Sequence, residues 1–555
     1  MIHLVLCWHF HQPDYRDETG NFVMPWTYLH AVKDYVDMAA HLEAHPDLRA
    51  VVNFVPTLLE QLDDYDRQFK SGDLRDPVLA SLVEPRLDRL GPVEREALIR
   101  ACFHLNAPTM LDPFPGYRRL RQLWEAAAED TAMLAYLSGD YLADLVTWYH
   151  LAWTGESVRR AHPWLLAMLE QGNGFSLKQR RALFHLLGDL IANLLPRYRA
   201  LAERGQIELS STPHSHPIAP LLIDLAVARQ ARPELPLPEA SLYPGGGARL
   251  EAHIEAALDS HAVHFGAPPR GLWPAEGGVS SAALARFSEA DIRWVASGEG
   301  VLRHTLAAAG QDVSQPWQWL LRPYRLPGHY TSCFFRDDYL SDLIGFEYKT
   351  WFARDAVRHF LHALEERYRP ASAQEPVVSI VLDGENAWEY YPYNGWYFLS
   401  DLYQALSEHP EIRTTTFSEY LDDHGHHARA LPRLVAGSWV YGDFTTWIGD
   451  PAKNRAWDLL CRAKQVYDDT VAGLDPKRAG AAERLLRSCE SSDWFWWFGD
   501  YNPAASVQAF DRLFRGKLRA LYHLLGQPVP ADLELSLSAG GGAAEAGGVM
   551  RRGGA

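Results

Sequence analysis

The chain of 555 residues is long enough for more than one domain, and 47% of its residues are hydrophobic, a composition typical of a globular protein with a large core. A formal net charge of -17 argues against nucleic acid or an anionic membrane as the partner, because both carry the same sign of charge. This charge balance favours a neutral polymer as the substrate.

The first residues, MIHLVLCWHFHQP, contain no basic leader, and His and Cys interrupt their apolar run. We therefore expect neither a signal peptide nor a membrane span. The 5 cysteines are widely scattered and lack CxxC spacing, which favours buried thiols in a reducing compartment. We predict a cytoplasmic protein.

Short apolar segments recur along the chain, and amphipathic helical patterns lie between them. This alternation predicts an α/β fold in which parallel strands close into a barrel. The seven predicted strands cover residues 4–8, 51–55, 207–209, 271–273, 292–296, 330–334 and 377–382.

The spacing of these strands divides the chain into domains. Residues 57–204 have almost wholly helical patterns, and we predict that they form an insertion within a barrel domain of residues 1–425. After a strand-like segment at 414–417, helical patterns predict a C-terminal all-helical domain at 426–530. The last segment, 531–555, is rich in Gly and Ala, so we expect a disordered tail there.

Two carboxylates stand at the ends of predicted strands, where α/β enzymes place their chemistry. Asp383 ends the apolar run VVSIVLD, and Glu276 follows the shorter stretch GLWPA. A pair of acids on either side of one sugar bond is what glycoside hydrolysis requires. Glu385 is near enough to reach the same cleft, and we interpret it as a partner of this pair. Its alternative role is an ion pair or a carboxylate at a helix N-terminus.

Histidines and tryptophans near these acids are candidates for contacts with sugar. In WHFHQP, alternation along the strand places His9 and His11 on the same side. Imidazole and amide groups can hydrogen-bond sugar hydroxyls, and flat indole faces can stack on sugar rings. The predicted substrate-binding residues are His11, Gln12, His216, Trp273, Trp388, Asp493 and Trp494.

Five segments together resemble glycoside hydrolase family 57, and the resemblance spans most of residues 1–505. The segments are HQP at 11–13, GQIELSSTPHSHP at 205–217, GLWPAEGG at 271–278, LDGENAWEYYP at 382–392 and SSDWFWWFGD at 491–500. The resemblance implies an incomplete (β/α)7 barrel followed by a helical domain that completes the active-site cleft. It also implies that Glu276 is the nucleophile and Asp383 the general acid/base of a retaining enzyme that needs no cofactor and no metal.

A retaining mechanism requires two carboxylates in unequal environments, roughly 5 to 5.5 Å apart. The general acid must hold a proton while the nucleophile stays ionised. We therefore expect Asp383 to be the less solvated of the two and to have the raised pKa, and we expect Glu276 to remain charged.

The predicted activity is hydrolysis of α-1,4 linkages in glycogen, starch or maltodextrin, with α-1,6 activity as in amylopullulanase-like relatives. A 4-α-glucanotransferase or a branching enzyme of the same family is the alternative, because transfer and hydrolysis share their first half-reaction. Two other classes stay open. The pairs His9/His11 and His214/His216 are typical of the Zn(II) ligands of a mannosidase or deacetylase, and a non-catalytic glucan-binding protein would be expected to lack one of the two acids.

Overall fold

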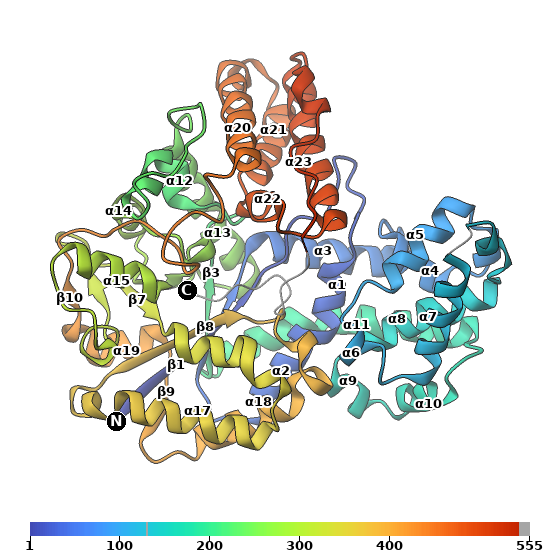
Figure 1. Ribbon diagram of the computed structural model, residues 1–555, viewed down its shortest axis with the longest axis horizontal. Coiled ribbons are helices and arrows are strands. Elements are labelled where there is room, and N and C mark those ends of the chain that lie inside the picture. The colour runs from blue at the N-terminus through green and yellow to red at the C-terminus, as the bar shows by residue number, and fades with distance from the viewer. Residues whose placement is uncertain (129–130, 543–555) are drawn as a thin grey trace.

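A computed structural model describes residues 1–128 and 131–542 of the chain. Within those residues, seven parallel strands form a barrel in the spatial order β7, β5, β4, β3, β2, β1 and β8, and a further pairing of β7 with β8 closes the ring. Figure 1 shows β1, β3, β7 and β8 of this barrel. The predicted α/β class and (β/α)7 barrel are therefore confirmed. The barrel strands are β1 Ile2–Phe10, β2 Ala50–Phe54, β3 Ile207–Ser211, β4 Gly271–Leu272, β5 Trp294–Gly298, β7 Ser332–Arg336 and β8 Val377–Asp383.

Some strand boundaries differ from the prediction because local hydrogen bonds decide them. Ile292 is predicted to open a strand, but its N–H donates to the Phe287 carbonyl in the turn that closes the preceding helix. Residues 414–417 are predicted as one strand, whereas β9 covers Ile412–Thr414 and the chain then turns into a helix whose N-cap is Thr416. Two further short strands are β6 Tyr324–Arg325 and β10 Arg429–Ala430.

Strand β1 alternates between the two faces of the sheet, and both faces are buried. Val5 and Cys7 belong to the apolar cluster inside the barrel. Trp8 and Phe10 belong to the larger cluster between the strands and the outer helices, where the Phe10 ring lies 4.4 Å from that of Tyr35. Burial on both faces is typical of parallel sheets and explains why the strand is a nearly continuous apolar run.

Helices surround the barrel on its outer side. Many of them begin where the sequence places a cap. Asp76, Asp450 and Asp475 each accept hydrogen bonds from N–H groups of the first turn, and a proline follows each of them at the first helical position. The helices associated with the barrel are α1 Trp26–His30, α2 Val36–Ala44, α12 Ala219–Ile223, α13 Gly246–Phe265, α14 Ser281–Glu289, α15 Glu299–Ala308, α16 Asp338–Asp342, α17 Ala353–Tyr368, α18 Trp396–Ser407 and α19 Phe417–His424.

The predicted insertion is a separate group of helices beside the barrel, on the right in Figure 1. Arg180 of its longest helix donates to the carbonyls of Ser81, Leu82 and Glu84, so the long helix holds the end of a shorter one in place. The helices that follow β2 are α3 Pro56–Ser71, α4 Pro77–Val83, α5 Pro92–Cys102, α6 Ala107–Met110, α7 Pro115–Ala128, α8 Gly139–Ala152, α9 Glu156–Ala161, α10 Pro163–Gln171 and α11 Leu177–Glu203.

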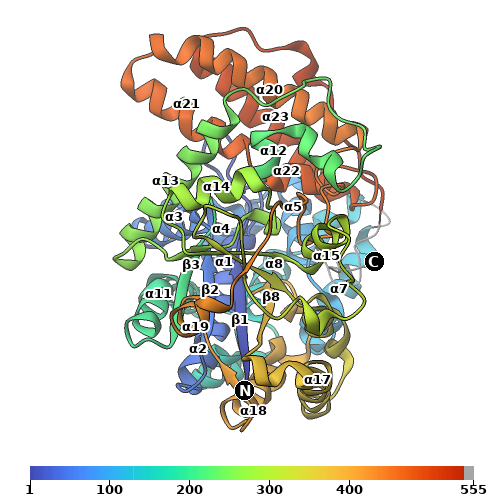
Figure 2. The same ribbon diagram turned by 90° about the vertical axis from the view of Figure 1, so that its left-hand side faces the viewer.

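The C-terminal helices lie over the end of the barrel that is remote from the N-terminus (Figure 2). They are α20 Pro451–Thr470, α21 Pro476–Cys489, α22 Ser492–Trp497 and α23 Ala504–Leu525. Because β1 starts at the N-terminus and all barrel strands are parallel, these helices cover the C-terminal ends of the strands. None of the helices in the described part of the chain has the length and apolar character needed to cross a membrane.

The predicted disordered tail is wrong for its first residues. A short 3-10 helix covers Ala531–Glu534, where Leu533 is fully buried. Leu537 is also buried, and its N–H donates to Asp511 of α23. Two apolar side chains in an otherwise small-residue segment are thus enough to pack it against the helical domain. Residues 543–555 lie outside the described residues.

Helix α19 fills the barrel from its N-terminal end. The ring of Phe417, the first residue of this helix, lies 4.4 Å from the ring of Trp294 and 4.5 Å from that of Phe334. Both partners are barrel residues in the inner apolar cluster. The carboxylate oxygens of Glu208 accept hydrogen bonds from Trp294 and from the backbone and hydroxyl of Ser418. The barrel is therefore a packed core below its mouth.

We predict that Phe417→Ala lowers the free energy of unfolding by about 3 to 5 kcal/mol, because it empties a closely packed position. Chemical denaturation followed by tryptophan fluorescence measures the change. Phe352→Ala is the matched control, since Phe352 is 86% exposed and should change stability by about 0.5 kcal/mol or less. An equal effect of the two substitutions would show that the packing of α19 contributes nothing.

Candidate active site

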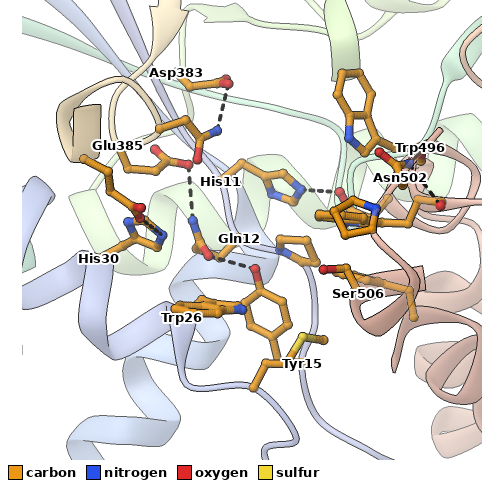
Figure 3. Close-up of a pocket in the computed structure, with 18 of the residues that line it drawn as sticks. His11, Gln12, Tyr15, Trp26, His30, Asp383, Glu385, Trp496, Asn502 and Ser506 are labelled. Atoms are coloured by element: carbon orange, nitrogen blue, oxygen red, sulfur yellow. Dashed lines mark hydrogen bonds and ion pairs between the residues drawn. The ribbon is translucent and has the colours of Figure 1, made fainter. Parts of the chain in front are cut away.

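A cavity of about 550 Å³ opens at the C-terminal ends of the barrel strands. Both predicted catalytic acids, Glu276 and Asp383, are among the residues that line it. Its wall also includes residues 104–107 of the insertion and several residues between 496 and 510 of the C-terminal region. Figure 3 shows Trp496, Asn502 and Ser506 facing the barrel residues across this cavity. Three segments far apart in sequence therefore build one site.

Glu276 stands in a sharp turn directly after β4. Its backbone is left-handed, with φ 57°, a conformation that costs energy for a residue other than glycine. Oε2 accepts a hydrogen bond from Nε1 of Trp439 at 3.0 Å, and the Trp439 N–H donates to the Glu276 carbonyl, also at 3.0 Å. Nδ1 of His216 lies 4.0 Å from Oε1. The segment after the barrel thus holds both the backbone and the carboxylate of Glu276.

Asp383 is the last residue of β8, and it lies opposite His9 of β1 in the parallel pairing. Its Oδ2 accepts a hydrogen bond from Nδ2 of Asn386 at 2.9 Å (Figure 3). Glu276 is close enough that the negative charge of Asp383 raises the pKa of the Glu276 carboxyl. The predicted separation of roughly 5 to 5.5 Å between the two carboxyl groups stays a prediction.

The electrostatics of the pair differ from the expectation. Burial, and next the charge of Asp383, raise the pKa of Glu276 to about 8. Burial also raises the pKa of Asp383, but the Asn386 hydrogen bond and the positive charges of His11 and Arg336 oppose that rise. The raised pKa of Asp383 agrees with the expectation. The expectation that Glu276 stays ionised in the free protein is wrong, because a pKa of about 8 leaves its carboxyl protonated at neutral pH.

Three histidines stack beside the acids. The ring of His216 lies 3.9 Å from that of His11 and 5.3 Å from that of His9. Burial, then the charges of the other two imidazoles, holds the pKa of His216 well below its usual value, and burial lowers the pKa of His9 to about 3. Both rings are thus neutral at physiological pH. Nε2 of His11 lies 2.8 Å from Oδ1 of Asp493, which ties the barrel to the first turn of α22.

The HxH pairs do not assemble into a four-histidine metal site. His214 turns away and bonds to Glu60 at 3.0 Å. His11, His216 and Asp493 do place donor atoms within 4.8 Å of one another. The rings of His11 and His216 are nearly parallel, however, with 18° between their planes, and imidazole binds a metal along the plane of its ring. Stacking of this kind suits hydrogen bonding along one wall better than joint coordination of an ion.

Gln12 is engaged on both sides of its amide group. Nε2 donates to Oε1 of Glu385 at 3.2 Å, and Oε1 accepts from the Tyr15 hydroxyl at 2.9 Å (Figure 3). Burial, and next the charge of Asp383, raise the pKa of Glu385 well above its usual value. Glu385 thus lies beside the pair and is linked to the barrel through Gln12, and its interpretation as a partner of the two acids stays a prediction.

The predicted stacking tryptophans are misplaced. Trp273, Trp388 and Trp494 are at most 1% exposed and do not line the cavity. Trp494 packs against Phe510 and Phe514 instead. Residues of a helix rotate by about 100° each, so in α22 Trp496 points roughly opposite to Trp494. The cavity wall has Trp26, Trp439, Trp496 and Trp497 as its tryptophans.

Sequence reasoning missed the role of Trp439. This residue lies in the segment GSWVYGDF, which follows the last barrel strand by more than 50 positions in the chain, and no local pattern links it to Glu276. The guanidinium of Arg336 lies 5.7 Å from the Trp439 ring and makes ion pairs with Asp338 and Asp342. A buried cation thus supports the indole that holds Glu276.

Comparison with solved structures identifies the same architecture elsewhere. A GH57 branching enzyme from Thermococcus kodakaraensis is 15% identical, with a TM-score of 0.56 over 94% of this chain and 90% of that one. A GH57-type branching enzyme from Pyrococcus horikoshii is 16% identical, with a TM-score of 0.56 over 96% and 93%. The α-amylase AmyC from Thermotoga maritima is 15% identical, with a TM-score of 0.57 over 96% and 95%. At this level of identity the similarity shows a shared fold. No curated protein sequence matches.

A seven-stranded parallel barrel with two acids at its mouth and helices over that mouth defines a class of barrel enzymes that act on glycosidic bonds. The model of glycosyl hydrolase family 57 matches residues 5–432. The chain belongs to this family, as the five sequence segments predict.

We predict that Glu276→Gln stabilises the protein at high pH. A carboxyl with a raised folded-state pKa contributes stability below its unfolded pKa and loses it as pH rises through the folded value. With a folded pKa of about 8, ionised Glu276 destabilises the fold at pH 9. The variant should gain on the order of a few kcal/mol over wild type there and little at pH 4. Urea denaturation at both pH values measures this, and a gain that is the same at both would contradict the assignment.

We predict opposite effects for two tryptophans of α22. Trp496→Ala should raise KM for long oligosaccharides more than for short ones, because Trp496 lines the cavity. Trp494→Ala should lower the free energy of unfolding by about 3 kcal/mol or more with no chain-length dependence. Steady-state kinetics on a series of chain lengths, together with denaturation curves, distinguish the two. A chain-length effect confined to Trp494→Ala would restore the original prediction.

Proposed function

We propose that this protein is a retaining glycoside hydrolase that cleaves α-1,4 linkages in glucans such as glycogen, starch or maltodextrin, with α-1,6 linkages as a further substrate. The observation that carries the proposal is the meeting of Glu276 and Asp383 in a single cavity at the mouth of the barrel. Membership of glycosyl hydrolase family 57 supports the reaction class. The similar structures include branching enzymes and an α-amylase, which supports α-glucan as the substrate class.

In the first step, the carboxylate of Glu276 attacks the anomeric carbon while Asp383 donates its proton to the glycosidic oxygen. The bond between carbon and oxygen breaks, and the sugar becomes an ester of Glu276. In the second step, Asp383 takes a proton from a water molecule, whose oxygen displaces Glu276. Each carboxyl ends in the protonation state in which it began.

The reaction requires the proton of the pair to sit on Asp383 and not on Glu276. A bound sugar changes the balance, because the transition state places positive charge at the anomeric carbon and so favours ionised Glu276. The hydrogen bond from Trp439 to Oε2 also favours the charged form. We infer that substrate binding moves the proton from Glu276 to Asp383, the residue that donates it to the leaving oxygen.

Transfer to a second glucan is the other candidate function, and one observation favours it. The cavity extends to His104 and Asn106 of the insertion and to Tyr390 after β8. Polar and aromatic side chains there offer a surface on which a sugar acceptor could displace water. A 4-α-glucanotransferase or branching enzyme would use the same two acids and the same glycosyl-enzyme.

We predict that Asp383→Asn and Glu276→Gln each reduce turnover of maltooligosaccharides by on the order of 100-fold or more. Chromatography of the products also separates the functions: shorter products indicate hydrolysis and longer ones indicate transfer. Asp259→Asn and Glu255→Gln are matched controls, because both side chains are exposed on α13, and they should retain wild-type rates.

Three results would contradict different parts of this proposal. Turnover within a few-fold of wild type in Asp383→Asn would remove the general-acid assignment. Binding of glucan without any product would favour a non-catalytic glucan-binding protein. Loss of activity after exhaustive chelation, restored by Zn(II), would favour the metal-dependent alternative.

A further inference from the structure

A second group of metal-binding side chains lies at the opposite end of the barrel. His3, Glu375 and His424 each offer a ligand atom, and these atoms all lie within 4.8 Å of one another. His3 stands near the start of β1, whereas His9 at the catalytic cavity stands near its end. At about 3.3 Å per residue, roughly 20 Å of strand separate the two. This group of side chains therefore lies outside the proposed catalytic site.

The three residues come from three different segments of the chain. His3 belongs to β1, Glu375 precedes β8, and His424 ends α19. Nε2 of His3 lies 2.8 Å from Oε2 of Glu375. The rings of His3 and His424 lie 4.7 Å apart with 58° between their planes. Unlike the stacked rings in the cavity, these tilted rings leave their edges free to converge on one ion.

The surroundings hold this arrangement in place. Glu375 has a left-handed backbone, with φ 48°, a strained conformation for a residue other than glycine. The Tyr420 hydroxyl donates to its carbonyl at 2.9 Å, and the Tyr420 ring lies 5.4 Å from His3 and 5.1 Å from His424. One residue of α19 thus contacts all three members of the group.

The chemistry of the donors suits a transition metal. Two imidazoles and one carboxylate form a common ligand set for Zn(II). Nε2 of His3 already faces the carboxylate of Glu375, so two of the three donors point toward one another across the place that an ion would take.

His427 supplies a further donor nearby. Its ring lies 5.7 Å from that of His424, and its pKa is lowered by burial and by His426 and His424. Its Nδ1 is buried and has no hydrogen-bond partner among the described residues. The segment HGHH therefore places a further imidazole, that of His427, at this end of the barrel, and its Nδ1 makes no hydrogen bond within the described part of the chain.

We propose that His3, Glu375 and His424 form a binding site for one divalent transition-metal ion, with Zn(II) as the best match. The ion replaces the proton of the hydrogen bond between His3 and Glu375, and this proton is released to solvent. It joins the start of β1 and the approach to β8 to α19, the helix that fills the barrel. Because it binds the folded chain alone, it stabilises the fold by mass action. This role is independent of the glucan chemistry proposed above.

The test uses the full chain after treatment with a chelator, and Co(II) serves as the probe because its visible absorption reports ligation by nitrogen and oxygen in a protein site. We expect one equivalent of Co(II) to bind and Zn(II) to displace it. Zn(II) should also raise the midpoint of thermal unfolding. His424→Ala and Glu375→Gln should each weaken binding on the order of tenfold or more and abolish the thermal shift.

Two further variants make the result specific. His362→Ala is the control, because His362 is an exposed residue of α17, 64% accessible, that pairs with Glu366 in the same helix; it should bind metal as wild type does. His11→Ala tests the cavity as the source of any binding. Absence of binding in wild type, or binding lost in His11→Ala and kept in His424→Ala, would overturn the proposal.

Discussion

The parallel pairing of β1 with β8 is the interaction on which the rest of the site depends. Its register places His9 opposite Asp383, while the pairing with β2 places Phe10 opposite Phe54. Side chains alternate along a strand, so a shift of β1 by one residue would turn His9 out of the cavity and away from Asp383, and would bring Trp8 and Phe10 into the barrel. Trp8 and Phe10, which fill the outer core, thereby fix the register of β1 and the position of His9 opposite Asp383.

The second acid is held by a different kind of constraint. Glu276 follows a strand of two residues, too short to define a side-chain position by itself. Its placement comes from the left-handed turn and from Trp439, whose backbone and side chain both bond to it. One carboxylate is thus positioned by the barrel and the other by the segment after the barrel. The two environments are unequal: burial and the charge of Asp383 raise the pKa of Glu276, whereas at Asp383 a hydrogen bond from Asn386 opposes the effect of burial.

The sequence predicts those parts of the fold and the site whose signals lie within a short segment of the chain. The strands are visible as apolar runs because both faces of each strand are buried, and Asp383 and Glu276 stand out because they end such runs. Trp494 could not be separated from Trp496 by composition, since only the rotation of α22 decides which indole faces the cavity. Trp439 carries no local signal, because its contact with Glu276 spans 163 positions. The raised pKa of Glu276 was missed for the same reason, since it follows from burial and from the charge of Asp383, which is distant in the chain.

The hydrogen bond from Trp439 to Glu276 has a consequence for how activity arises during synthesis. A ribosome completes β8, and with it both acids, before it reaches Trp439 and well before it reaches Asp493 and Trp496. A nascent or truncated chain would therefore carry the reactive carboxylates without the indole that orients one of them or the helices that cover them. The proposed catalytic site is therefore complete only when nearly the whole polypeptide has been synthesised, because its walls come from segments far apart in the chain.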